Sequence, residues 1–342
     1  MWDCYSYDGA ARLSATNRYK QDGSDWPEAA AYTYAYDGNG NVESIRASGT
    51  GGKPIQADLS RGGNDQIMSA SLGSGDLTAA YDATYGNMTG ISSAGGAGYA
   101  LKLAVDPVLN LPIGQNVANI ASGATLLTTA IAYDANGLRA SRTVSAGSEG
   151  SGSSTTEYWY GGNLHPLVID RDGVTSRMIG KSVIEQIAAG NSVTRAYLYD
   201  DHGGSVRVIT DDAGAVTLSL GYDGDWGSTR ISGQDHAASY GSVASFYRYK
   251  GQEQEIFPLG TLNIADSALA AWLDELQLYH FPLRDYASGL AAFMQTDPIP
   301  TEDSLYAAFG ANPANFGDDN GAMLQEDADE GERIEQLLDQ LL

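Results

Sequence analysis

The sequence has a single cysteine, Cys4, few basic residues and no long apolar run. One cysteine cannot form an intramolecular disulfide, which excludes a disulfide-stapled fold. No apolar stretch reaches the ~18 residues of a membrane span, and the first residues lack the basic segment and apolar run of a classical signal peptide. We therefore expect no membrane span. If the protein is exported, we expect another route, or a fragment of a longer exported chain.

Basic residues are scarce, with 19 Lys and Arg against 43 Asp and Glu, and the formal net charge is −24. An acidic surface repels the phosphate backbone, so we expect no nucleic-acid partner. Phe is also scarce, with 6 residues, whereas there are 42 Gly and 21 Tyr. Glycine suits tight turns, and tyrosine suits strands in which the ring covers a sheet face while the hydroxyl reaches water. The composition thus favours strands and tight turns.

Residues 197–223, YLYDDHGGSVRVITDDAGAVTLSLGYD, show the basic unit of the chain. Two alternating runs, residues 205–210 and 215–220, flank the turn at 211–214. A period of two on either side of a Gly-closed turn predicts a β-hairpin. One Tyr-Asp pair precedes this hairpin and another follows it.

Tyr-Asp pairs recur along the chain at loose intervals of roughly 25–30 residues, as expected for repeat units. Asp and Asn side chains bond to nearby backbone and Gly takes the positive φ of a tight turn, so each copy predicts strand, turn and strand. The copies begin at Tyr7, Tyr36, Tyr81, Tyr133, Tyr199 and Tyr222, with a degenerate copy at Val105. We expect the Gly- and Ser-rich residues 93–98 and 146–154 to be long hairpin loops, the alternative being domain linkers.

Two segments show helical periodicity. The first is residues 264–277, with Asp266 or Ser267 as the N-cap. Its apolar positions at i, i+3, i+4 and i+7 are Leu269, Trp272, Leu273 and Leu276. The second is an apolar stripe in residues 334–342, within an end that carries nine acids and one base from position 318 onward. This stripe either docks a partner or packs on the protein's own surface.

The Tyr-Asp-x-x-Gly copies resemble the YD repeats of the Rhs family, and the second half of the chain resembles that family's C-terminal core region. The core-like segments are YDDHGGSVRVITD at 199–211, YKGQE at 249–253, YHFPLRDYASGLAAFMQTDP at 279–298 and LYAAFGANPANFGDDNG at 305–321. The resemblance divides the chain into repeats at 1–195, a core at 196–321 and an acidic tail at 322–342.

This resemblance implies an all-β fold of YD-repeat hairpins in a curved or spiralling sheet, with one inserted helix and an acidic C-terminal helix. Alternate strand residues are expected to line the inner face, with Tyr rings and acids on the outer face. The implied role is structural, as part of a β shell that encloses a C-terminal toxin polypeptide. The implied partners are the toxin cargo or its remnant and a secretion apparatus or shell partner, and the implied location is secreted or cell-surface. Open sheet edges also favour an oligomer.

Many members of the family cut themselves at the end of the core with a centre like that of an aspartyl protease. In such a centre two close carboxylates cannot both ionise, so one acts as base and the other as acid. The resemblance assigns Asp297, Asp318 and Arg284 to these roles, while the alternative for both Asp residues is to order turns beside Pro298 and Gly321. The chain departs from the family's pattern at Pro300, Asp319, Ala287-Ser288 and Ala291-Ala292.

No other chemistry emerges from the sequence. Its four histidines lie far apart without metal-ligand spacing, and the Asp-rich turns lack the ligand series of a calcium loop. No glycine motif for a nucleotide is present. We therefore predict no metal, no cofactor and at most autoproteolysis. The alternative class is a surface adhesin or carbohydrate-binding repeat protein, whose exposed Tyr, Trp, Asp and Asn side chains would contact sugars.

Overall fold

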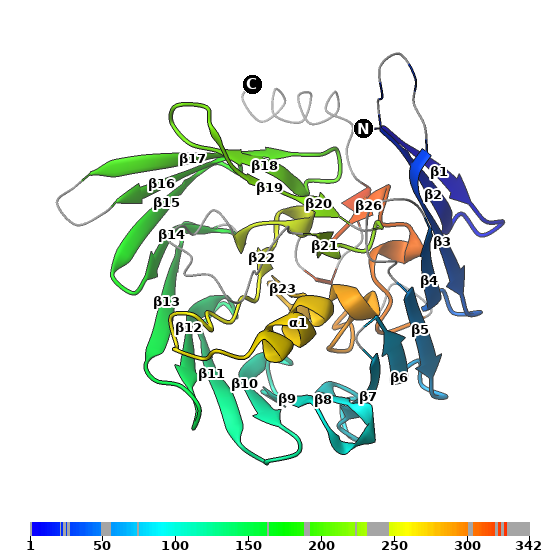
Figure 1. Cartoon of the computed structure of the whole chain (residues 1–342), viewed down its shortest axis with the longest axis horizontal. Helices are drawn as coiled ribbons and strands as arrows, with labels where there is room; N and C mark the ends of the chain where they lie inside the picture. Colours follow the sequence, from blue (N-terminus) through cyan, green and yellow to red (C-terminus); the bar gives the residue numbers. More distant parts are fainter. Residues whose placement is uncertain are drawn as a thin grey trace.

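The computed structural model describes residues 2–20, 22, 25, 28–48, 56–73, 75–162, 164–187, 192–222, 224–230, 246–299, 304–318, 321–322 and 325–326. The largest part of the structure is one 19-stranded antiparallel sheet in which each strand pairs with its neighbours in sequence. Figure 1 shows this long sheet curving around the later segments, drawn in yellow and orange, which lie on its concave side. The prediction of an all-β fold with a long sheet and one short helix is confirmed.

The strands of the long sheet are β1 (Trp2–Tyr7), β2 (Leu13–Tyr19), β3 (Glu28–Tyr36), β4 (Val42–Ser48), β5 (Gln56–Arg61), β6 (Ile67–Leu72), β7 (Gly75–Tyr81), β8 (Met88–Ser93), β9 (Tyr99–Val105), β10 (Pro112–Asn119), β11 (Thr125–Tyr133), β12 (Arg139–Ala146), β13 (Ser153–Tyr160), β14 (Pro166–Arg171), β15 (Val174–Ile179), β16 (Val183–Ile187), β17 (Val193–Asp200), β18 (Val206–Thr210) and β19 (Val216–Ser219). The two glycine-rich loops connect β8 to β9 and β12 to β13, so both belong to hairpins, as predicted. The expected boundary at 195/196 falls inside β17, and the sheet continues beyond it.

The remaining elements form the docked core on the concave side. They are β20 (Gly221–Tyr222), β21 (Thr229–Arg230), β22 (Glu253–Gln254), α1 (Ser267–Leu276), β23 (Leu278–Phe281), β24 (Arg284–Ala287), β25 (Ala292–Phe293), β26 (Phe316–Gly317) and β27 (Gln325–Glu326). The predicted helix is α1, and the Asp266 side chain caps it by accepting bonds from the backbone N–H groups of Ala268 and Leu269. None of the helices in the described ranges has the length and apolarity that a bilayer span needs. The helix expected at 334–342 lies outside the described residues.

The repeat turns share one hydrogen-bond pattern. After β3, the Asp37 backbone N–H donates to Asn41 O (3.0 Å), while Asp37 Oδ1 accepts from the N–H groups of Asn39 and Asn41. Gly40 closes the turn with a left-handed φ of 84°. The same carboxylate pattern occurs at Asp8, Asp134, Asp201 and Asp211. The Asp side chain therefore replaces missing backbone partners, as in an Asx-turn.

Two turns depart from the Tyr-Asp rule. In the Tyr199-Asp200 copy, the carboxylate that orders the turn belongs to the next residue, Asp201. Between β5 and β6, Gly62 takes the position of the Asp, and its N–H still donates to Gln66 O at 2.9 Å. This turn was missed from the sequence because it contains no Tyr-Asp pair.

The tyrosines that precede the turns reach back to the previous hairpin. Tyr36 Oη donates to Leu13 O (2.6 Å), and Tyr133 Oη donates to Pro112 O (2.7 Å). The Tyr36 ring also lies near Trp226 of the docked core, at 6.4 Å between ring centroids. The expectation that Tyr rings cover the outer face is wrong for these residues. The docked core fills the concave side, and the hydroxyl groups find backbone carbonyls instead of water.

A buried charge network joins the long sheet to the docked core. Arg139 Nη1 forms an ion pair with Glu255 Oε1, and Arg142 Nε lies 2.5 Å from Glu255 Oε2. Arg139 Nη2 is 3.8 Å from Asp285 Oδ1. The side chains of Arg139, Glu255 and Asp285 are each only 1% exposed. Both arginines come from β12 and both carboxylates from the core, so the network fixes how the two parts meet.

The turn geometry predicts a stabilising substitution at Ala11. This exposed residue occupies the position held by glycine in the turns of Asp37 and Asp134, and its φ is 62°. A side chain in the left-handed region costs about 1 kcal/mol, partly offset by the greater unfolded-state entropy of glycine. We expect Ala11→Gly to raise the free energy of unfolding by about 0.5–1 kcal/mol, measured by urea denaturation. Gly137→Ala should lower it by a similar amount, since a Cβ there meets only Leu111 Cδ1 at 3.9 Å. No change in either variant would contradict strain at this position.

The charge network predicts a large penalty for removing one partner. Arg139→Met leaves Asp285 without its arginine and Glu255 with only one, and breaking a buried pair costs about 3–5 kcal/mol. The matched control is Arg46→Met, because the pair that Arg46 makes with Asp58 is 44% and 45% exposed. We expect the control to change the urea-derived free energy of unfolding by less than about 1 kcal/mol. Equal effects of the two substitutions would rule out a special role for the buried network.

Candidate functional site

The three residues that the sequence singles out meet in the docked core. Arg284 is the first residue of β24, whereas Asp297 and Asp318 lie in the loops that follow β25 and β26. Arg284 Nη2 lies 3.0 Å from Asp297 Oδ2 and 3.3 Å from Asp318 Oδ2. The side chains are 2%, 9% and 4% exposed, respectively. The two carboxylates therefore share one guanidinium nitrogen in a nearly dry environment.

Each carboxylate uses its second oxygen to order a turn. Asp297 Oδ1 accepts from the Ile299 N–H at 2.8 Å. Asp318 Oδ1 accepts from the N–H groups of Gly321 (2.7 Å) and Ala322 (3.0 Å). The turn-ordering role and the contact with Arg284 thus occur together, because a carboxylate has two oxygens with separate lone pairs.

Arg284 is held from several directions. Its guanidinium carbon lies 3.6 Å from the centroid of the Phe293 ring, and its Nη1 donates to Leu305 O at 3.5 Å. Its Nε donates to the carbonyl oxygen of Gly321. Gly321 has a φ of 79°, and a Cβ there would lie 3.0 Å from Phe281 Cβ and 3.1 Å from Arg284 N. Only glycine lets the backbone approach the arginine this closely.

The Gly321–Ala322 peptide lies inside this group of charges. Its carbonyl oxygen accepts from Arg284 Nε, and its amide nitrogen donates to Asp318 Oδ1. Burial is the main cause that raises the pKa of Asp297; the Arg284 charge opposes this shift and the nearby Asp318 charge adds to it. A cation at a peptide carbonyl oxygen can stabilise negative charge that develops there.

Two of the departures from the family's pattern lie within the described ranges. Ala291 has a left-handed φ of 48°, a conformation that glycine adopts more readily than alanine. Ala287 is the fully buried last residue of β24. The other two, Pro300 and Asp319, lie outside the described residues.

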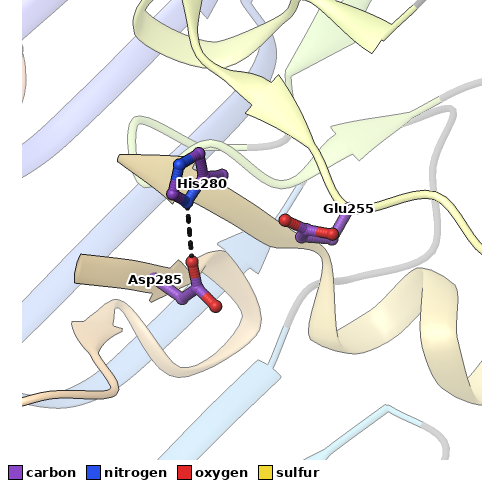
Figure 2. Close-up of side chains that lie close together, drawn as sticks. All are labelled: Glu255, His280 and Asp285. Atoms are coloured by element: carbon purple, nitrogen blue, oxygen red, sulfur yellow. Dashed lines mark hydrogen bonds and ion pairs between the residues drawn. The ribbon is translucent and has the colours of Figure 1, made fainter. Parts of the chain in front are cut away.

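A second cluster of ionisable side chains was not foreseen. Figure 2 shows Glu255, His280 and Asp285, whose ligand-type atoms lie within 4.8 Å of one another. His280 Nδ1 is 3.1 Å from Asp285 Oδ1, and the two residues face each other across the β23–β24 hairpin. The only sequence signal for this pair was the hairpin spacing in HFPLRD, and Glu255 lies in a separate segment.

These three side chains could hold a divalent cation, but arginines already neutralise the two carboxylates. Arg139 contacts both Glu255 and Asp285, and Arg142 contacts Glu255. Burial and the two arginine charges hold the pKa of His280 well below its usual range, whereas burial raises the pKa of Asp285 to about 6. A further cation would meet two positive charges here. The cluster thus fits a structural ion network better than a metal centre.

Comparisons with known proteins found likeness only at the level of structure. No family model matches the sequence, and no curated protein matches it. The structure "TcdB2-TccC3-Cdc42" aligns over 94% of this chain with a TM-score of 0.49 and 15% identity. The structure "TcdB2-TccC3-TEV" aligns over 93% with a TM-score of 0.48 and 18% identity. A Tc holotoxin pore of Photorhabdus luminescens aligns over 94% with a TM-score of 0.47 and 16% identity.

The chain spans only 15–18% of the length of these solved chains. At such identities and TM-scores the likeness carries no argument about activity, cargo or partners. The chain therefore matches solved Tc toxin components along most of its own length, and it corresponds to a small part of theirs.

Proposed function

We propose that this chain is a structural segment of a YD-repeat β shell, and that Arg284, Asp297 and Asp318 form a centre that cuts the chain's own backbone. The observation that carries the second part is the position of the Gly321–Ala322 peptide between Arg284 and Asp318. Toxin cargo, a secretion or shell partner and a secreted or cell-surface location belong to the same proposal. They derive from the resemblance to the Rhs family.

The way the core docks supports a closing role within such a shell. Aromatic side chains of the core fill the concave side, with Trp226 near Tyr34 (6.4 Å) and Trp272 near Tyr99 (5.8 Å). A folded cargo cannot lie between this core and the sheet, because those side chains are already packed together. Cargo would have to lie beyond the core, in space enclosed by further strands added at the open edge of β1 or β19.

The burial of several tyrosines weakens the alternative of a sugar-binding surface. Several tyrosines that could stack on sugars are buried against the core, including Tyr32, Tyr34, Tyr99 and Tyr158, which are 3–8% exposed. Tyr36 and Tyr133 use their hydroxyl groups on backbone carbonyls. A glycan-array screen distinguishes the two classes, since a shell segment should bind no glycan.

The cleavage that the geometry supports is hydrolysis of the Gly321–Ala322 bond. Asp297 takes a proton from a water molecule, whose oxygen forms a new bond to the Gly321 carbonyl carbon. Arg284 stabilises the negative charge that develops on the carbonyl oxygen. The C–N bond then breaks as Asp297 passes this proton to the Ala322 nitrogen, while Asp318 holds the Ala322 N–H. The products are a new carboxyl terminus and a new amino terminus, and Asp297 returns to its ionised form.

We predict that the freshly purified chain is cut after Gly321, which intact-mass spectrometry detects as loss of residues 322–342. Asp297→Asn removes the base and should slow cutting at least ~100-fold, the usual contribution of acid–base groups. Asp318→Asn should also slow cutting, because it removes the charge that holds the Ala322 N–H and pairs with Arg284. The matched control is Asp106→Asn, which changes an exposed turn carboxylate and should leave cutting unchanged.

Full-length mass in the parent after prolonged incubation would reject the cleaving centre and leave the structural role. Cutting that persists in Asp297→Asn would instead point to a contaminating protease. Because burial raises the pKa of Asp297, the rate should increase with pH as that carboxyl group ionises and then level off.

A further inference from the structure

The outer face of the long sheet changes character along the chain. On β5 to β8, a row of directly paired outer residues reads Ser60, Ser69, Thr78 and Ser92. On β15 to β18, the corresponding row reads Ile179, Val183, Tyr197 and Thr210. Ile179, Val183 and Tyr197 have therefore replaced small hydroxyl side chains on this part of the surface, whereas Thr210 keeps a hydroxyl group and is only 8% exposed.

Ile179, Val183 and Tyr197 pair directly with one another, and with the apolar residues around them they form an area that we call the outer apolar patch. Its members all lie on the face opposite the buried residues Ile169, Ile184 and Leu198. They are Trp159, Val168, Ile179, Val183, Val193 and Tyr197. Trp159 and Ile179 are each 49% exposed and Val193 is 46% exposed. Contiguous apolar surface of this kind usually marks an interface.

A row of charges crosses the patch in a defined order. Arg177, Glu185 and Arg195 pair directly across β15, β16 and β17. Arg195 Nε lies 2.8 Å from Glu185 Oε1. These basic residues stand out on a chain with 19 bases and 43 acids.

We propose that the outer apolar patch binds the same patch of a second copy of this chain, in a two-fold symmetric, sheet-on-sheet contact. A two-fold axis between Glu185 and Arg195 places each Glu185 opposite the partner's Arg195. The same operation brings Val183 of one copy toward the partner's Tyr197. One surface thus supplies both halves of the contact, as an isologous interface requires. Twisted sheets with β-branched and aromatic faces pack in this way at a separation of about 10 Å.

Charge favours this alignment of the two copies over a nonspecific contact between them. Each copy carries a formal net charge of −24, so two copies repel each other at long range. The Glu185–Arg195 row provides local attraction where the surfaces touch. Salt screens the long-range repulsion over about 10 Å at 0.1 M, so moderate salt should strengthen the dimer.

The test is sedimentation velocity of the full chain over a range of micromolar concentrations and at several salt concentrations. We expect a concentration-dependent dimer that Ile179→Asp weakens at least ~10-fold in dissociation constant, since a buried charge replaces an apolar contact. The matched control is Thr128→Asp, which adds the same charge to the outer face of β11. That control should leave the dimer unchanged. Both variants alter exposed side chains, and urea denaturation confirms that each still folds.

A charge exchange tests the register. Glu185→Arg alone places like charges across the two-fold axis and should weaken the dimer. The double variant Glu185→Arg with Arg195→Glu restores opposite charges and should recover it. A monomer at every concentration overturns the proposal. A dimer that resists Ile179→Asp also overturns it, and would point to pairing at the strand edges.

Discussion

The pairing of arginines on the long sheet with carboxylates on the docked core is the interaction on which the rest of the structure depends. Neither part is a complete fold alone. The sheet presents a concave apolar face that must be covered, and the short strands of the core need that face to pack against. Apolar packing supplies most of the favourable free energy but specifies position weakly. Arg139 and Arg142 against Glu255 specify it strongly, because a misplaced core would leave buried charges without partners.

The same kind of charge pairing accounts for where this acidic chain places several of its few basic residues. Of 19 basic residues, 14 are arginines, and several of the most buried side chains are arginines that face carboxylates of the core. Arginine suits this use because its guanidinium stays charged and serves two carboxylates at once. Arg139 bridges Glu255 and Asp285 in this way, and Arg284 bridges Asp297 and Asp318.

The sequence predicted those features that depend on neighbouring residues. The Asp-x-x-Gly turns, the hairpins and α1 all follow from local hydrogen bonding and periodicity, and the core residues Arg284, Asp297 and Asp318 came from resemblance to a family. Features that depend on the concave side were not predictable. Two features arise only when the core docks on the sheet: the inward direction of Tyr36, and the cluster of Glu255, His280 and Asp285. No local sequence pattern shows which face of the sheet the core will cover. The turn at Gly62 was missed because its backbone has the same geometry as the other turns but lacks the Asp that marks them in the sequence.

The two arginine-centred groups differ in what lies beside the guanidinium. In both, one guanidinium holds two buried carboxylates, and in both the pKa of a carboxyl group is raised mainly by burial. Around Arg139 the ion-pair partners are the side chains of Glu255 and Asp285, and the neighbouring Arg142 donates to the main-chain oxygen of Ile256. Around Arg284 the glycine at position 321 admits a main-chain peptide into direct contact with the cation and with Asp318. A side chain at that position would push the backbone away from Arg284, so the cleaving role that we propose depends on Gly321 as well as on the two Asp residues.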